Sequence, residues 1–192
     1  MNAIAVCPGF HPAALTYGFV EQLQTVMPAN DSLFVFPVER YQAYSGVDIL
    51  RFLHEQLSRQ APDLWLRTPI TFVGFSAGVV GAMGAAIALE LMGGRVNALF
   101  ALDGWGVPIA GRFPVHRLSH DYLTHWSSAL LGAGLDSFYA DPGVDHLELW
   151  RLPHTVQGQW ISANATQVSQ SITALNFLAY WLQQYQPSSN GF

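Results

Sequence analysis

The sequence contains no lysine, and its 8 basic side chains are all arginine. Without lysine, the chain has neither a Schiff-base lysine nor the lysine of a Walker-type phosphate loop, and it cannot make polylysine contacts with nucleic acid or anionic lipid. The sequence has 13 acidic residues, so its formal net charge is −5. We therefore expect no nucleic-acid partner.

Cysteine is nearly absent as well. Cys7 is the single cysteine, so no internal disulfide can form. The first residues, Met1 to Val6, lack the basic start and the long apolar core of a secretory signal. These features predict a reducing, cytoplasmic location.

Charge is missing altogether from residues 68–89, a run long enough to span a bilayer. Pro69 and a series of glycines, among them Gly74 and Gly78, divide this run into a β-branched piece and a small-residue piece. Such a division is typical of a buried strand that leads into a buried helix. We therefore predict no membrane span.

What the sequence does contain is a regular alternation of short apolar runs and amphipathic stretches, in 192 residues of which 51% are hydrophobic. This pattern predicts an α/β fold, with a three-layer, doubly wound and mostly parallel sheet. We expect one domain over residues 1–186, followed by a flexible tail at 187–192. The strands are predicted at Ala3–Cys7, Leu33–Phe36, Ile70–Val73, Ala98–Leu102, Phe138–Tyr139 and Leu147–Leu152. Helices are predicted after Pro12, after a cap at Ser45, over Ala77–Met92, over Tyr122–Leu131 and over Ile172–Tyr185. Between the fourth strand and Tyr122, residues 104–119 are predicted to form a long connection.

The most informative motif is Gly74-Phe75-Ser76-Ala77-Gly78, which lies between a predicted strand and a predicted helix. A tight turn at this position holds its central residue in a strained backbone conformation, so small glycines must flank that residue. Ser76 would then project from the carboxyl edge of the sheet, at the N-terminus of a helix. The motif therefore makes Ser76 a candidate nucleophile.

This motif resembles the nucleophile turn of the α/β-hydrolase superfamily, of the small serine esterase, lipase and thioesterase kind. A second motif, Pro8-Gly9-Phe10-His11, follows the first strand and is similar to the oxyanion loop of small esterases, with the order of His and Gly changed. The resemblance implies that the N–H groups of Phe10 and Ala77 form an oxyanion hole. It implies no cofactor.

A serine nucleophile needs a histidine base, and seven histidines are present. We predict His154 as the base, because it follows the last predicted strand. The resemblance to the α/β-hydrolases implies that the base lies at this position. His146 would lie at the opposite end of that strand, on the wrong edge of a parallel sheet. His120, beside Asp121, is the strongest rival.

The carboxylate partner of the histidine is predicted to be Asp103, which ends the strand expected beside that of Ser76. This choice gives the chain order serine, aspartate, histidine. Asp121, Asp136 and Asp141 remain alternatives. A metal site built on the four-residue spacing of His116 and His120 is disfavoured by Pro114 and Arg117, and we expect no metal.

Together these features predict a serine hydrolase that cleaves a carboxylic ester or thioester through an acyl-enzyme, with Ser76, His154 and Asp103 as its triad. His11 and Trp105 are candidates for binding a small, apolar acyl substrate. The alternative is a catalytically inactive hydrolase-fold protein that binds a small ligand or a partner protein. A flavodoxin-like nucleotide binder is disfavoured, because Pro8 and Pro12 remove two N–H donors from the first loop. The apolar composition is also compatible with a homodimer.

Overall fold

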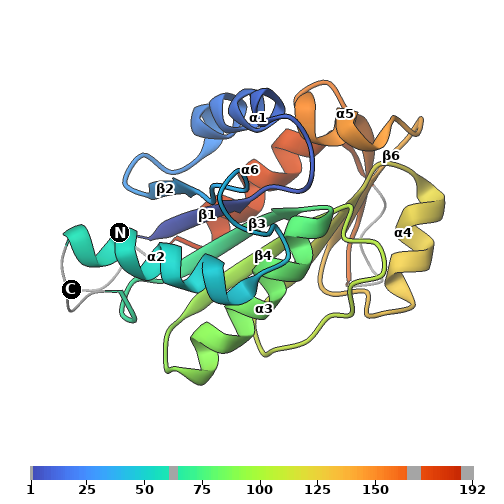
Figure 1. Cartoon of the computed structure of the whole chain (residues 1–192). Helices are drawn as coiled ribbons and strands as arrows, with labels where there is room; N and C mark the ends of the chain where they lie inside the picture. The colour runs from blue at the N-terminus through green and yellow to red at the C-terminus, as the bar shows by residue number, and fades with distance from the viewer. Residues whose placement is uncertain (1, 61–64, 164–169, 187–192) are drawn as a thin grey trace, which may run out of the picture.

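The computed structural model of the chain describes residues 2–60, 65–163 and 170–186. An eight-stranded sheet forms its centre, with the strand order β2-β1-β3-β4-β5-β6-β7-β8. Figure 1 shows β2, β1, β3 and β4 side by side in this order. The strands are β1 (Ala3–Cys7), β2 (Ser32–Val35), β3 (Ile70–Phe75), β4 (Val96–Leu102), β5 (Val115–Ser119), β6 (Ser137–Ala140), β7 (Gln157–Ile161) and β8 (Gln170–Thr173). The helices are α1 (Ala13–Val26), α2 (Gly46–Gln60), α3 (Ala77–Leu91), α4 (Tyr122–Ala129), α5 (His146–Arg151) and α6 (Ala174–Gln184).

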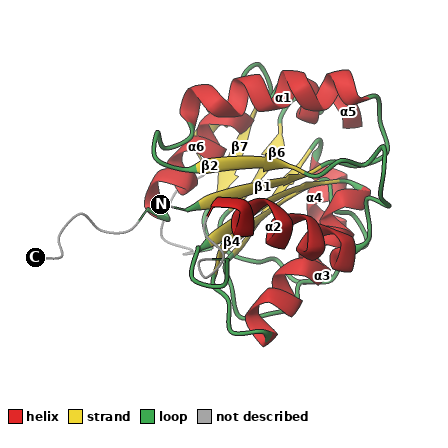
Figure 2. Cartoon of the chain, turned by 60° about the vertical axis from the view of Figure 1, so that its left-hand side comes forward, coloured by secondary structure: helices red, strands yellow, loops and turns green. Residues whose placement is uncertain are grey.

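Helices cover both faces of the sheet, α1, α5 and α6 on one face and α2 and α3 on the other (Figure 2). Alternate residues of a strand point to opposite faces. In β1, Ile4 and Val6 accordingly join the core under α1, α5 and α6, whereas Ala3, Ala5 and Cys7 join the core under α2 and α3. The central strands are apolar because both of their faces are buried.

The predicted fold class is confirmed. Strands β1 to β6 pair in parallel, and β7 and β8 add two antiparallel pairings at one edge. β1 lies between β2 and β3, so the chain reverses its direction of winding at the carboxyl ends of β1 and β3. Ligands of open α/β sheets bind at such a switch point.

Two predictions of secondary structure are wrong. The segment predicted as a strand over Leu147–Leu152 is the short helix α5, and the connection predicted over residues 104–119 contains the buried strand β5. β5 contains His116 and Arg117, and these polar residues interrupt the apolar pattern that would predict a buried strand. The structure buries both side chains because they are hydrogen-bonded: His116 to the Asp136 carbonyl and the Tyr185 hydroxyl, and Arg117 to backbone carbonyls.

The antiparallel strands β7 and β8 were also not predicted, because they are short and rich in polar residues. The charge-free run at 68–89 is divided between β3 and α3, as predicted. No helix in the described part of the chain is long and apolar enough to span a membrane. The tail predicted at 187–192 lies outside the described residues.

Candidate active site

Ser76 lies in a sharp turn between β3 and α3, with φ 53° and ψ −123°. A non-glycine residue seldom adopts a positive φ, so this backbone is strained. The flanking glycines are required by close packing. A Cβ on Gly74 would lie 2.9 Å from the Val79 Cα, and one on Gly78 would lie 2.0 Å from the carbonyl oxygen of Cys7. The predicted strand, strained serine turn and helix are therefore present.

The loop after β1 packs directly against this turn. A Cβ on Gly9 would lie 2.9 Å from the Phe75 carbonyl oxygen and 3.0 Å from the Ser76 Cβ. Within the described ranges, the backbone N–H groups of Phe10 and Ala77 donate no hydrogen bond. Neither N–H group is therefore paired within the described structure, and their role as an oxyanion hole stays a prediction.

Asp103 follows β4 and also has a positive φ, 50°. Its carboxylate is almost completely buried and accepts three hydrogen bonds. Oδ1 accepts from the backbone N–H of His120 at 2.9 Å, and Oδ2 accepts from Nδ1 of His120 at 3.0 Å and from Nδ1 of His146 at 2.9 Å. Three donors therefore hold one carboxylate at the carboxyl edge of the sheet.

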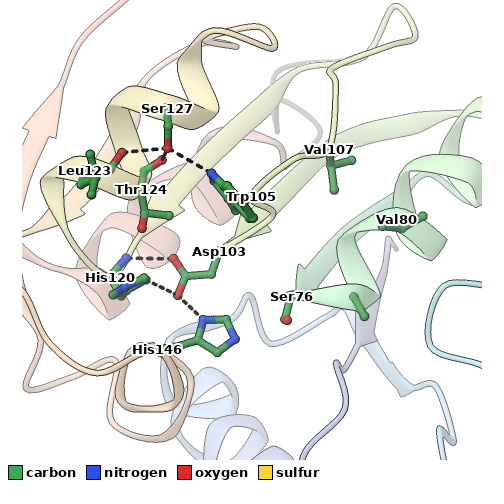
Figure 3. A pocket seen from close by; sticks show the side chains of 11 residues that line it. Ser76, Val80, Asp103, Trp105, Val107, His120, Leu123, Thr124, Ser127 and His146 are labelled. Atoms are coloured by element: carbon green, nitrogen blue, oxygen red, sulfur yellow. Dashed lines mark hydrogen bonds and ion pairs between the residues drawn. The ribbon is translucent and has the colours of Figure 1, made fainter.

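His146 is the first residue of α5, and its ring contacts both Asp103 and the serine turn. The ring stacks on Phe75, with centroids 4.7 Å apart and an interplanar angle of 23°. Phe75 directly precedes Ser76, and Figure 3 shows the His146 ring between Asp103 and Ser76. The side chain is 42% exposed, which leaves it room to rotate. No hydrogen bond joins Ser76 to either histidine among the residues that the structure describes.

His120 follows β5 and approaches the same carboxylate oxygen from the other side (Figure 3). Its hydrogen bond to Asp103 raises the pKa of His120 against the opposing effect of burial, and the charges of Asp103, Asp121 and Asp145 raise it further. Since both rings turn Nδ1 toward an acceptor-only carboxylate, the neutral form of each carries its proton on Nδ1. Nε2 of each ring is then free to accept a proton.

The structure does not bring His154 to this group. His154 follows α5, is exposed, and contacts the side-chain oxygen of Gln22 on α1. Among the alternative acids, Asp121 caps α4 through the Thr124 N–H at 2.7 Å, with Oδ2 3.7 Å from Nε2 of His120. Asp136 accepts from the Trp160 indole at 2.6 Å, and Asp141 from the amide of Gln159 at 3.4 Å. Of the four acids considered, Asp103 alone contacts both histidines.

The serine, the carboxylate and both histidines open into a pocket of about 570 Å³. Its lining comes from the ends of β3, β4 and β5 and from α3, α4 and α5. The lining residues are Ser76, Ala77, Val80, Asp103, Trp105, Val107, His120, Leu123, Thr124, Ser127 and His146. Trp105, which is predicted to bind substrate, lines this pocket, and its indole N–H donates to the Ser127 hydroxyl at 3.1 Å.

His11, the other predicted substrate-binding residue, is not among the residues that line this pocket. Its Nε2 pairs with the Thr16 hydroxyl at 2.9 Å, and its ring lies edge-on to Phe75 and Trp150. Burial lowers the pKa of His11, and the nearby charge of protonated His146 lowers it further. His11 thus packs against Phe75 and Trp150, outside the residues that line the pocket.

His146 is not predicted as the base, because the segment that follows it is predicted to be a strand. A helix-start signal was present: Asp145 stands three residues before Glu148, and the Glu148 N–H donates to the Asp145 carbonyl at 2.8 Å. That signal places His146 at the start of a helix that follows β6. A histidine there faces the carboxyl edge of the sheet.

No protein-family model matches the sequence, and no curated protein matches it. Solved structures do. One is YbtT, a type II thioesterase from the yersiniabactin biosynthetic pathway, with 15% identity, a TM-score of 0.49, and coverage of 77% of this chain and 86% of that one. Another is a putative hydrolase of the α/β superfamily from Xanthomonas campestris, with 19% identity, a TM-score of 0.38, and coverage of 64% and 75%. The chain is similar to each of these structures over the share of its length given.

Proposed function

We propose that the protein is a serine hydrolase that cleaves a carboxylic ester or thioester through an acyl-enzyme. Ser76 is the nucleophile, His146 the general base, and Asp103 the carboxylate that orients the base. The observation that carries this proposal is the 2.9 Å hydrogen bond from His146 Nδ1 to a buried carboxylate, beside a strained serine turn. In this proposal His146 replaces His154.

The chemistry follows from the proton positions. With its Nδ1 proton donated to Asp103, neutral His146 has a lone pair on Nε2 to accept the Ser76 proton as Oγ attacks the carbonyl carbon. The oxyanion then accepts hydrogen bonds from the N–H groups of Phe10 and Ala77. Collapse of the tetrahedral intermediate transfers the Nε2 proton to the leaving alcohol or thiol. Water, deprotonated by the same Nε2, hydrolyses the acyl-serine.

The absence of a hydrogen bond between Ser76 and His146 is compatible with this role. In enzymes without substrate, catalytic hydrogen bonds are often long and shorten only when substrate binds. The exposed fraction of His146 and its position at a helix N-terminus leave room for its ring to turn toward Ser76.

The pocket wall favours an uncharged, apolar acyl group. Val80, Trp105, Val107 and Leu123 supply apolar surface around Ser76, and no arginine is among the lining residues. Apolar surface of this kind binds a chain by excluding water and offers no partner to a charged substituent.

The proposal is tested by labelling with a fluorophosphonate probe and by hydrolysis of acyl esters of increasing chain length. We expect labelling of the native protein and none of Ser76→Ala. His146→Ala is expected to lose about 10³-fold or more in kcat/KM. His154→Ala is the matched control, a histidine deletion outside the pocket, and is expected to keep activity within a few-fold. Equal losses in the two histidine variants, or no labelling of the native protein, would refute the assignment.

A second candidate function is binding of an apolar ligand without turnover. The observation in its favour is that neither histidine is hydrogen-bonded to Ser76 in the described structure. It predicts that a fluorescent fatty-acyl ligand binds the native protein and Ser76→Ala equally, while the probe labels neither.

A further inference from the structure

The cluster of Asp103, His120 and His146 contains one histidine more than proton transfer from Ser76 requires. One histidine on the carboxylate suffices to orient a base toward Ser76. Here two imidazoles, one after β5 and one at the start of α5, turn the same ring atom, Nδ1, to the same oxygen of Asp103. One potential ligand atom from each of the three residues lies within 4.8 Å of the other two.

Two imidazole nitrogens and one carboxylate oxygen are a donor set that suits Zn²⁺. A tetrahedral zinc ion with bonds of about 2.0–2.1 Å separates neighbouring donors by about 3.3 Å. The two N···O distances here are 3.0 and 2.9 Å. Binding of an ion would therefore lengthen each of these two N···O distances by a few tenths of an ångström.

We propose that Asp103, His120 and His146 form a binding site for one Zn²⁺ ion, and that an ion held there blocks hydrolysis. The surroundings of the cluster support this assignment. Asp103 Oδ1 is fixed by the His120 backbone N–H, so Oδ2 is the oxygen that faces the ion. Binding of metal through Nδ1 requires His120 to move its proton to Nε2, and the Asp121 carboxylate, with Oδ2 3.7 Å from Nε2, would stabilise a proton there by its charge. The adjoining pocket leaves a fourth position open to water.

The block on hydrolysis follows from the tautomer of His146. With Nδ1 bound to the ion, a neutral imidazole carries its proton on Nε2 and has no lone pair for the Ser76 proton. The ion also takes the Asp103 oxygen that orients the ring. Zinc binding and serine catalysis thus exclude one another at this cluster. The inhibition rests on the function proposed above, whereas the binding does not.

Binding is measured by competition between the full-length protein and a chromophoric zinc chelator. We expect one ion per chain, equal affinity in Ser76→Ala, and an affinity reduced at least about tenfold in His120→Asn and His120→Gln. His154→Asn, which removes a histidine outside the cluster, is expected to bind as the native protein does. Co²⁺ in the site should give visible d–d bands without a thiolate charge-transfer band, because Cys7 is buried in the core and is not a ligand. Circular dichroism checks that each variant is folded.

Inhibition is measured as the zinc concentration that halves ester hydrolysis, each variant being compared with its own rate in chelator. We expect this concentration to rise in His120→Asn by the factor found for binding, and to stay unchanged in His154→Asn. The site is refuted if the native protein binds no stoichiometric zinc, or if the folded His120 variants bind as tightly as the native protein. If zinc binds with the expected dependence on His120 while the native protein neither labels nor hydrolyses, the zinc site stands and the hydrolase proposal fails.

Discussion

Replacement of Asp103 by asparagine tests the whole hydrogen-bond arrangement of the site with a change of one atom. Asparagine tolerates a positive φ as aspartate does, so the backbone at this position is not disturbed. The carboxylate accepts three hydrogen bonds, one at Oδ1 and two at Oδ2. The amide offers one acceptor oxygen and one NH₂ donor in their place, so it cannot satisfy all three donors.

The amide has two orientations. If its oxygen faces the His120 backbone N–H, the NH₂ faces both Nδ1 atoms, and His146 must move its proton to Nε2. With its proton on Nε2, His146 cannot accept the Ser76 proton. We then expect kcat to fall by about 10³- to 10⁴-fold, which corresponds to an activation free energy higher by about 4–5.5 kcal/mol. If the oxygen faces the histidines, the NH₂ opposes a backbone N–H that cannot change. This leaves a buried donor unsatisfied at a cost of about 1–3 kcal/mol in the free energy of unfolding.

The backbone N–H is the donor that cannot adapt, so we expect the first orientation, with a fall in kcat of about 10³-fold or more and little change in KM. The assay is steady-state hydrolysis of an acyl ester, with urea unfolding to measure stability. The matched control is Asp121→Asn, which keeps the cap on α4 and contacts only His120 of the two histidines. We expect kcat of this variant to change by a few-fold at most. Activity of Asp103→Asn within about tenfold of the native protein would show that this carboxylate does not set the tautomer of the base.

Three further predictions concern stability and specificity. Burial lowers the pKa of His116 to about 4, so between pH 6.5 and pH 4 the unfolded chain binds a proton that the native chain does not. The free energy of unfolding should therefore fall by about 3 kcal/mol as the pH is lowered through this range. Urea unfolding of His116→Gln should not show this loss. Gly78→Ala places a Cβ 2.0 Å from a backbone oxygen and should lower the free energy of unfolding by about 3 kcal/mol or more. In Gly84→Ala the new Cβ has its nearest neighbour at 3.7 Å, so this variant should stabilise α3 by up to about 1 kcal/mol. Similar melting temperatures for the two variants would contradict this prediction. Trp105→Ala should lower kcat/KM about tenfold for long acyl esters and little for acetyl esters, and an equal loss on both would argue against an acyl-binding role.

The features that could be predicted from the sequence are those fixed by neighbours in the chain. The turn at Ser76 is one, because the apolar strand and helix flank it directly and Gly74 packs against Val79 of the helix that follows. The central strands are another, since residues buried on both faces must be apolar. Asp103 could be placed because β4 is predicted beside β3, and the structure pairs these strands in continuous register from Thr71 to Phe75, after a register shift between Ile70 and Thr71.

The strands that could not be predicted depend on partners far away in the chain. β5 is buried with a histidine and an arginine in it. His116 is accommodated by the Tyr185 hydroxyl, 69 residues later, at 2.6 Å. Arg117 is accommodated by the carbonyls of Val107 and Gly132, each at 2.8 Å. Nothing local to the strand indicates that these polar groups will be satisfied, so a pattern based on burial assigns the segment to a loop.

The choice of base illustrates how one local error changes an assignment of function. Histidines stand on either side of the segment 147–152, His146 before it and His154 after it. If the segment were a strand parallel to its neighbours, only its far end would reach the carboxyl edge of the sheet, and His154 would be the base. Because the segment is a helix that begins after β6 has already reached that edge, the near end lies at the site, and His146 meets Asp103 at 2.9 Å. The identity of the base therefore depends on whether these six residues form a helix or a strand. The local signal for a helix is the spacing of Asp145, at the N-cap position, and Glu148 three residues later, although the Asp145 side chain makes no capping hydrogen bond.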